Sequence, residues 1–212
     1  MTEIDFMKQG FEYFPNFLTP EDEANILKVI DQNSDQWHYM GVGTNQRAMQ
    51  SYGFNYTKGS QGLNITTPIP EELMPLIMKI NSMMFGVGDT DRQFNQMTVN
   101  RYLPGQGIDP HWDHPTRFGD KILGLTLGSG ATMVFEQPKN KLTVDVDDSP
   151  TSSARFEKYL EPCSLYLMRD SIRYSWRHGI RRVHHDLVGD QTIARGIRTS
   201  LTFRTCQLEQ VL

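Results

Sequence analysis

Two histidines and one aspartate have the residue types and the spacing of a metal site. His111 and Asp113 are separated by one residue, and His178 lies far downstream. On a β-strand, residues two apart point to the same face, so an imidazole and a carboxylate can reach one ion. Two histidines and one carboxylate form a facial triad that leaves open positions on Fe(II). We interpret the three residues as a candidate iron site, with a polar corner after a turn and a hydrogen-bonded core histidine as the alternatives.

A second His-x-Asp pair shows how readily this pattern arises. His184 and Asp186 have the same spacing, but no histidine follows them in the chain. This pair would need a third ligand from an upstream segment, so the first pair is the stronger candidate. His114 points away from the face that His111 and Asp113 share, and we assign it to the substrate side or to the surface.

An alternating segment near the C-terminus has the chemistry of an anion site. Its polar positions are Arg198, Ser200, Thr202 and Arg204. On a strand these four side chains share one face, which would be costly in a core unless an anion neutralised it. The planar guanidinium group binds a carboxylate through two parallel hydrogen bonds. The segment therefore predicts a dicarboxylate site, and a solvated edge strand is the alternative.

Length and composition limit the kind of protein that carries these residues. The chain has 212 residues, of which 38% are hydrophobic and 22% charged, with a net charge of -4 and two cysteines. The length predicts one domain over residues 1–212, and the net charge excludes a generally basic protein that coats nucleic acid. We expect no membrane association, because we find neither a bilayer-spanning apolar stretch nor a secretory signal. The two cysteines, Cys163 and Cys206, lie far apart in the sequence, so we expect reduced thiols in a protein of the cytoplasm or nucleus.

Two helices and a series of short strands must position these residues. Helix signals begin at Thr19-Pro20 and near Pro70, and Pro75 is expected in the first turn of the second helix. Strands are predicted at 96–102, 121–127, 132–135, 141–146, 164–168, 172–176 and 198–204, and a surface loop at 147–153. Many short strands packed by two helices indicate a mainly β (α+β) fold of the sandwich or jelly-roll type.

These motifs, in this order and at these spacings, resemble the AlkB family of Fe(II)/2-oxoglutarate dioxygenases. The resemblance rests on the triad, on the alternating segment, and on Asn100-Arg101-Tyr102 and Pro104-Gly105. It runs over most of the chain, from about residue 13 to residue 205. The family implies a double-stranded β-helix (jelly roll) core at 95–206, with helical support and a substrate lid at 1–94.

The resemblance also implies a cofactor, two cosubstrates and a role for each site residue. Fe(II) would be held by the triad, while 2-oxoglutarate and O2 serve as cosubstrates and a substrate C–H bond is oxidised. Arg198 would pair with the distal carboxylate of 2-oxoglutarate, and Asn100 and Tyr102 would add hydrogen bonds. Arg204 would lie near the proximal carboxylate and the metal. The residues expected to take part in catalysis are His111, Asp113, His178 and Arg204, and Ser200 and Thr202 share the cosubstrate face. Ser200 stands where many members have asparagine, which leaves its role open.

Several segments point to a substrate class within the family. Residues 96–108, 125–129 and 173–180 are similar to the AlkB homologue that hydroxylates a modified wobble uridine in tRNA. By that resemblance, Arg47, Tyr52 and Phe54 would border the base pocket, and Trp112 and His114 could reach the substrate. The basic residues Arg169, Arg173, Arg177, Arg181, Arg182, His184 and His185 surround the metal histidine. Such a stretch suits phosphate contact, with a solvated strand edge as the alternative.

We therefore expect a dioxygenase that hydroxylates or demethylates a modified base in RNA, with tRNA favoured. Nucleic acid is the expected partner, and a protein that supplies RNA binding would be a second one. The same oxygenase chemistry on a protein or small molecule is the first alternative. A non-catalytic binding module that kept the fold is the second alternative.

Overall fold

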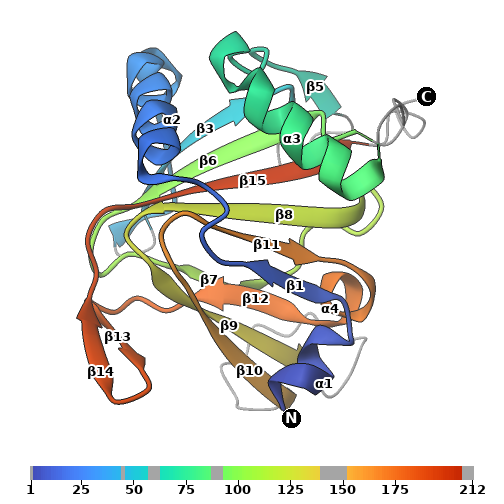
Figure 1. The fold of residues 1–212 in the computed structure, drawn as a ribbon, viewed down its shortest axis with the longest axis vertical. Helices are drawn as coiled ribbons and strands as arrows, with labels where there is room; N and C mark the ends of the chain where they lie inside the picture. Colours follow the sequence, from blue (N-terminus) through green and yellow to red (C-terminus); the bar gives the residue numbers. More distant parts are fainter. Residues whose placement is uncertain (1, 44–45, 57–62, 87–92, 139–151, 207–212) are drawn as a thin grey trace.

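Two β-sheets face each other in the computed structural model, which describes residues 2–43, 46–56, 63–86, 93–138 and 152–206 (Figure 1). The larger sheet has seven strands in the order β1 (Phe11–Phe14), β11 (Ser164–Met168), β8 (Phe118–Gly128), β15 (Arg198–Cys206), β6 (Gln96–Tyr102), β3 (Arg47–Tyr52) and β2 (His38–Met40). The smaller sheet has the order β10 (Ser152–Leu160), β9 (Ala131–Pro138), β12 (Arg177–Ile180) and β7 (Ile108–His111). Two hairpins, β4 (Phe54–Tyr56) with β5 (Leu63–Ile65) and β13 (His185–Val188) with β14 (Gln191–Ala194), stand apart from these sheets. The two facing antiparallel sheets are the predicted jelly roll.

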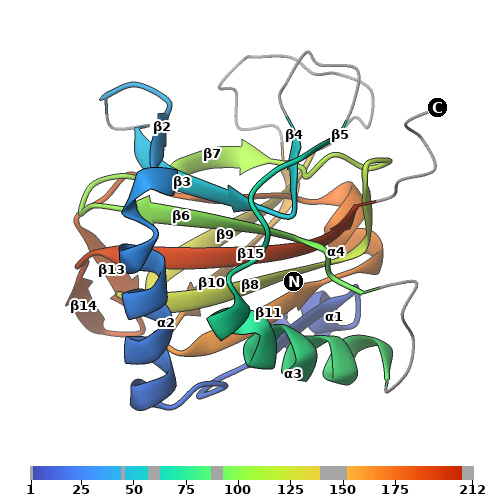
Figure 2. The ribbon, with the colours of Figure 1, turned by 90° about the horizontal axis from the view of Figure 1, so that it is seen from above.

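Both predicted helices are present and pack on the larger sheet (Figures 1 and 2). Helix α2 (Pro20–Gln32) begins with a capping box between Thr19 and Asp22 and has a proline in its first turn. Helix α3 (Met74–Phe85) follows the short 3-10 helix η3 (Glu71–Leu73) and also has a proline in its first turn. The shorter helices are α1 (Glu3–Met7), α4 (Asp170–Ser175) and the 3-10 helix η1 (Ser34–Gln36). Among the described residues, no helix combines the length and apolarity needed to cross a bilayer.

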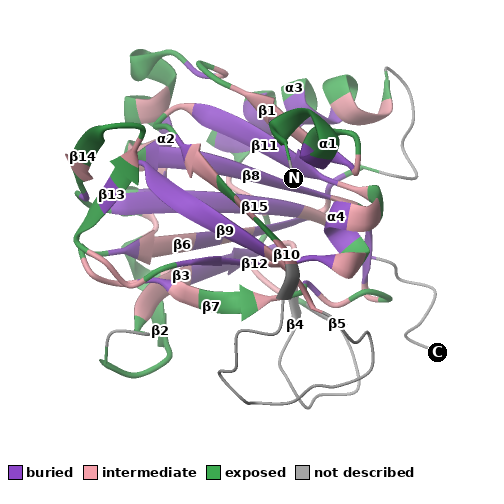
Figure 3. Cartoon of the chain, turned by 90° about the horizontal axis from the view of Figure 1, so that it is seen from below, coloured by how far each residue is buried: buried purple, intermediate pink, exposed green. Residues whose placement is uncertain are grey.

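Strand β15 separates two interiors because its side chains alternate between its faces. Leu201 and Phe203 are fully buried in the cluster that includes residues of α2 and α3. The four polar side chains at 198–204 point the other way, toward the smaller sheet. Figure 3 shows the resulting buried centre, in which β8, β15 and β9 are purple over most of their length.

An aromatic cluster joins helix α1 to strands of both sheets. The ring of Phe6, from α1, lies 4.0 Å from Phe156 and 5.2 Å from Trp176, measured between ring centroids. Phe11 and Phe135 join the same cluster. Burying this much aromatic surface anchors the short N-terminal helix.

Two predictions about the elements need correction. Residues 172–176 are not a strand: they belong mostly to helix α4, and Ile172 and Trp176 are buried while Tyr174 is 47% exposed. Burial at positions i and i+4 is the helical period, whereas a strand would bury alternate residues. The division at residue 94 is also too sharp, because β1, β2 and β3 extend the larger sheet. The predicted strand at 141–146 and most of the loop at 147–153 lie outside the described residues.

Candidate active site

The three predicted metal ligands converge between the sheets. Strand β12 pairs with β7 so that His178 lies opposite His111, and Asp113 follows two residues after His111. One ligand atom from each residue lies within 4.8 Å of the other two. The Nε2 atom of His178 is 3.5 Å from Oδ2 of Asp113. Cross-strand pairing thus joins residues that are far apart in the sequence.

The free ligand atoms of the triad fit a bound cation. Arg204 donates to Oδ1 of Asp113 through Nε and Nη2, each at 2.7 Å. The other oxygen, Oδ2, is buried and accepts no hydrogen bond from the described residues. Nδ1 of His111 lies 2.8 Å from the carbonyl oxygen of Asp109, which favours the tautomer with its lone pair on Nε2. The site therefore presents a carboxylate oxygen and imidazole nitrogens that need a partner.

The charge state of the triad is set by burial and by Arg204. Burial opposes the ionised form of Asp113, but Arg204 and the nearby His178, His111 and Arg173 together outweigh it, and the pKa of Asp113 lies well below its ordinary value. Burial lowers the pKa of His178 to about 3, and the neighbouring His111 adds to this effect. At neutral pH the carboxylate is thus charged and the His178 imidazole is neutral, which are the forms that bind a metal.

A cavity of about 210 Å³ extends from the triad between the sheets. The four residues of the predicted polar face of the alternating segment line it, together with side chains of β6 and β3. The polar lining residues contributed by these three strands are Arg198, Ser200, Thr202, Arg204, Gln96, Thr98, Asn100, Tyr102, Arg47 and Ser51. One face of the larger sheet is therefore a polar wall opposite the metal ligands.

Arg198 lies in this wall and is 4% exposed. Its Nη2 atom donates to the hydroxyl of Thr126 at 3.0 Å, whereas its Nε is buried and has no partner among the described residues. The guanidinium lies 5.8 Å from the ring centroid of Tyr102. A buried guanidinium with an unused N–H is costly until an acceptor binds it. A carboxylate fits this position.

Two of the expected substrate residues, Arg47 and Tyr52, lie on opposite faces of strand β3. Arg47 lines the cavity, and its Nε donates to Oδ1 of Asn100 at 2.9 Å. Tyr52 is 1% exposed in the helix-side core, where its hydroxyl donates to Gln50 at 3.0 Å. The expectation that Tyr52 borders the pocket is therefore wrong, because residues five apart on a strand face opposite sides. Phe54 packs, partly buried, against the aromatic cluster and does not line the cavity.

The remaining expected substrate residues, Trp112 and His114, lie outside this cavity. Trp112 is 39% exposed and lines a separate cavity that includes Tyr174. His114 is half-buried, and its backbone carbonyl accepts a hydrogen bond from Arg173 at 2.8 Å. The structure therefore brings neither side chain to the metal cavity.

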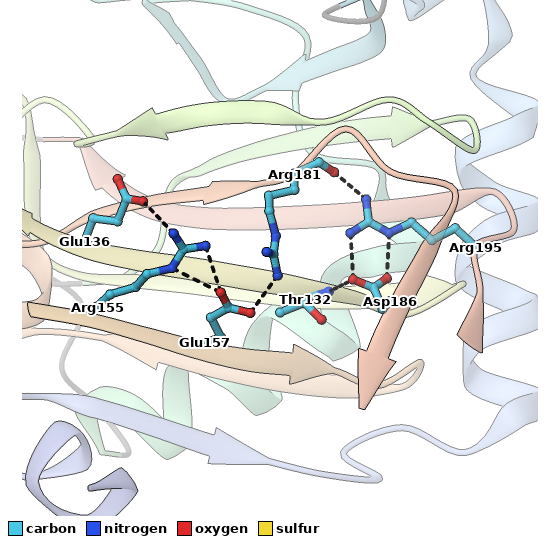
Figure 4. A network of polar contacts seen from close by, with 7 residues as sticks. All are labelled: Thr132, Glu136, Arg155, Glu157, Arg181, Asp186 and Arg195. Carbon is cyan, nitrogen blue, oxygen red and sulfur yellow. Dashed lines mark hydrogen bonds and ion pairs between the residues drawn. The ribbon is translucent and has the colours of Figure 1, made fainter. Parts of the chain in front are cut away.

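The second His-x-Asp pair has a structural role (Figure 4). Asp186 forms a two-bond ion pair with Arg195, at 2.6 and 2.7 Å, and also accepts the Thr132 backbone N–H. Arg195 donates further to the carbonyl oxygen of Arg181. Both side chains are at most 5% exposed. Both carboxylate oxygens of Asp186 are therefore occupied. Its hydrogen bond to Thr132, on β9, ties the β13–β14 hairpin to the smaller sheet.

The basic stretch around His178 is largely neutralised. Four of its arginines form ion pairs with carboxylates: Arg169 with Glu12, Arg177 with Glu136, Arg181 with Glu157, and Arg182 with Asp109. Arg173 is different, because it is buried and its hydrogen bonds end on backbone carbonyls. The stretch is therefore closer to the solvated-strand alternative than to a continuous phosphate-binding surface.

Several residues of the site were missed in the sequence. Gln96 and Thr98 each accept a hydrogen bond from Nη1 of Arg204, at 3.0 and 3.2 Å. Both alternate with Asn100 along β6, so extending the period of two backward would have found them. Tyr166 also lines the cavity, from β11. No local signal marks it, because it stands in an apolar strand.

Comparisons with known proteins support the same kind of site as the geometry. Residues 10–204 match the model of the 2OG-Fe(II) oxygenase superfamily. An uncharacterized protein, L905, of Acanthamoeba polyphaga mimivirus is 33% identical over 202 residues, which are 95% of this chain and 87% of that protein. The Danio rerio protein named probable RNA/DNA demethylase ALKBH6 is 27% identical over 207 residues, which are 91% of this chain and 83% of that protein.

A longer relative and a solved structure also resemble this chain. The Xenopus tropicalis protein named tRNA (carboxymethyluridine(34)-5-O)-methyltransferase alkbh8 is 28% identical over 211 residues, covering 92% of this chain but 31% of that protein's length. The structure of OsALKBH1 has a TM-score of 0.60 at 16% identity, covers 92% of this chain and 98% of that one, and shares the fold. With the triad in place, the chain belongs to the 2OG-Fe(II) oxygenase superfamily and is an AlkB-like dioxygenase that uses Fe(II), 2-oxoglutarate and O2.

Proposed function

We propose that this dioxygenase oxidises a modified base in RNA, and that tRNA is the substrate to test first. The observation that carries the chemistry is the cavity in which the metal triad faces a wall with the buried Arg198 and the partly buried Arg204. The names of its relatives support the substrate class: one is named a probable RNA/DNA demethylase, and another carries a tRNA modification in its name. The second name describes a protein more than three times as long as the matched region, so its methyltransferase activity is not carried over.

The proposed roles follow from the positions of the side chains. Fe(II), when bound with 2-oxoglutarate and O2, supplies the oxidation of a substrate C–H bond to C–OH, with succinate and CO2 as coproducts. Arg198 holds the distal carboxylate of 2-oxoglutarate through its unused N–H. Arg204 orients Asp113 and keeps it ionised. Arg198 is buried and Arg204 is largely shielded from water, which strengthens the interaction of each charge with its partner.

We assign Arg47 to the substrate rather than to the cosubstrate. It belongs to β3, at the far side of the polar wall from Arg198, and is half-buried. Through its hydrogen bond to Asn100 it is held in the cavity. A cation there favours an electron-rich or anionic group on the substrate, which suits a nucleotide.

The experiment measures succinate formation with Fe(II) and 2-oxoglutarate in the absence and presence of total tRNA, single-stranded RNA and DNA. We expect tRNA to stimulate turnover, and His178→Ala to abolish it. Mass spectrometry of the digested tRNA then identifies the changed nucleoside and shows whether the product is an alcohol or a demethylated base. Tight binding of 2-oxoglutarate without stimulation by any nucleic acid would contradict the proposal.

A second candidate is the same chemistry on a protein or small molecule. The ion pairing of the basic stretch favours it, because those arginines are not free for phosphates. Succinate formation with a peptide or metabolite pool, and none with nucleic acid, is the result that would select it.

A further inference from the structure

A second cavity lies on the other side of the loop that carries Asp113. Its volume is about 360 Å³, and Trp112, Pro115, Pro138 and Tyr174 are among its walls. Asp113 lines this cavity as well as the metal cavity, so the two are separated by one loop. We call it the Trp112–Tyr174 cavity.

The aromatic residues of this cavity are exposed and accompanied by guanidinium groups. Trp112 is 39% exposed and Tyr174 is 47% exposed. The guanidinium of Arg177 lies 5.7 Å from the Trp112 ring centroid, and that of Arg173 lies 4.9 Å from the Tyr174 ring centroid. Aromatic rings and arginine planes are the surfaces on which unpaired nucleotide bases stack.

The charge at this cavity also fits a nucleic acid. Arg173 is 3% exposed and donates to the carbonyl oxygens of Asp113 at 2.9 Å and His114 at 2.8 Å. These acceptors carry no net charge, and the Asp113 carboxylate is held by Arg204 in the metal cavity. Within the described part of the chain, Arg173 is thus the one arginine of the basic stretch without an ion pair to a carboxylate. An anionic occupant is favoured over a neutral one.

We propose that the Trp112–Tyr174 cavity binds an unpaired nucleotide of the RNA strand whose modified base enters the metal cavity. This inference rests on the proposed function and adds a second contact to it. The base stacks against Trp112 and Tyr174, and its phosphate lies on the side of Arg173. Because the two cavities are on either side of one loop, a single strand can occupy both. The site thereby selects unpaired over duplex RNA.

The test measures binding of fluorescein-labelled RNA by anisotropy, with Fe(II) and 2-oxoglutarate present under anaerobic conditions. The RNAs are an anticodon stem-loop, an oligouridine of 12 nucleotides and a blunt duplex. We expect Trp112→Ala and Tyr174→Ala each to raise the Kd for the first two RNAs by roughly 5- to 150-fold. Trp112→Phe, which keeps an aromatic ring, recovers most of the affinity. Leu187→Ala, at a side chain that is 73% exposed on the β13–β14 hairpin, leaves the Kd unchanged.

The visible band of the Fe(II)–2-oxoglutarate chelate reports whether each variant retains an intact site. Variants that keep this band but lose affinity for single-stranded RNA, with an increased KM for RNA and an unchanged KM for 2-oxoglutarate, support the inference. Unchanged RNA affinity in both alanine variants overturns it and leaves the proposed function standing. A wild-type protein that neither binds RNA nor is stimulated by it overturns both. If Trp112→Ala loses the band, Tyr174→Ala, which is further from the ligands in sequence, decides the question.

Discussion

Arg204→Met is the most direct test of how the metal-binding carboxylate is held. The side chains of Arg204 and Asp113 are 12% and 6% exposed, and two hydrogen bonds of 2.7 Å join them. Methionine fills a similar volume but leaves Asp113 buried without its cation, which costs about 3–5 kcal/mol. The entropy of unfolding is roughly 0.45 kcal/mol per kelvin for this length, so we expect the Tm of the metal-free protein to fall by about 7–11 °C.

A pH dependence distinguishes this mechanism from a general loss of packing. In the wild type the pKa of Asp113 is lowered, so the ionised carboxylate stabilises the fold at pH values above 3.8, its ordinary pKa. This stability is lost as the pH falls below that value. Arg204 is the strongest of the nearby charges that lower this pKa, so without it the pKa of Asp113 rises and the ionised carboxylate adds less stability. The difference in Tm between the two proteins should therefore be largest near neutral pH and shrink as the pH falls below 3.8, where the wild type loses this contribution.

The assay is thermal unfolding followed by circular dichroism, after removal of metal with a chelator. Arg155→Met is the matched control, because Arg155 forms an exposed ion pair with Glu157 and should cost at most about 1 kcal/mol. A fall in Tm below about 2 °C for Arg204→Met, or a difference that does not change with pH, would refute the reasoning.

Two further predictions concern the buried arginines Arg198 and Arg195. Arg198→Met should weaken 2-oxoglutarate binding by roughly 30-fold or more, since a charged partner of a buried carboxylate is lost, and titration of the chelate band measures it. Arg198→Lys should recover part of this affinity, and equal binding by all three proteins would contradict the assignment. Asp186→Asn should lower the free energy of unfolding by about 3–5 kcal/mol, because Arg195 loses a charged partner inside the protein. Burial opposes ionisation of Asp186 but its hydrogen bonds to Arg195 and Thr132 lower its pKa, so this loss, measured in urea, should be present at neutral pH and diminish below pH 3.8.

The strand predictions that succeeded depend on a local property. At 198–204 the alternation of polar and apolar residues is the period of a strand, and this segment is a strand with the predicted polar face on the cavity. The predicted strand at 96–102 is also present. The start of α2 was predictable for the same reason, because Thr19 and Pro20 act within one turn of the helix. Such signals need only neighbours in the sequence.

The predictions that failed depended on information from elsewhere in the chain. Tyr52 was assigned to the pocket from the resemblance to an AlkB homologue. The pairing of β3 with β6 instead directs its side chain to the helix-side core. Ile172, Tyr174 and Trp176 suit either a strand or a helix, and burial in the aromatic cluster selects the helix. The basic stretch was judged from its own composition, while the carboxylates that neutralise it come from β1, β7, β9 and β10.

By itself, the sequence determined the kinds of chemistry that the chain can perform. The triad residues, the two arginines of β15 and the alternation that places them on one face are all encoded locally, because residue type and the period of a strand do not require knowledge of the fold. The tertiary structure decided which of these residues meet. Pairing of β7 with β12 brings His178 to His111, and the facing of the two sheets brings Arg204 to Asp113. The fold also brings Asp186, of the second His-x-Asp pair, into an ion pair with Arg195. Contacts between distant segments depend on strand register and sheet packing, which the burial of the whole chain sets.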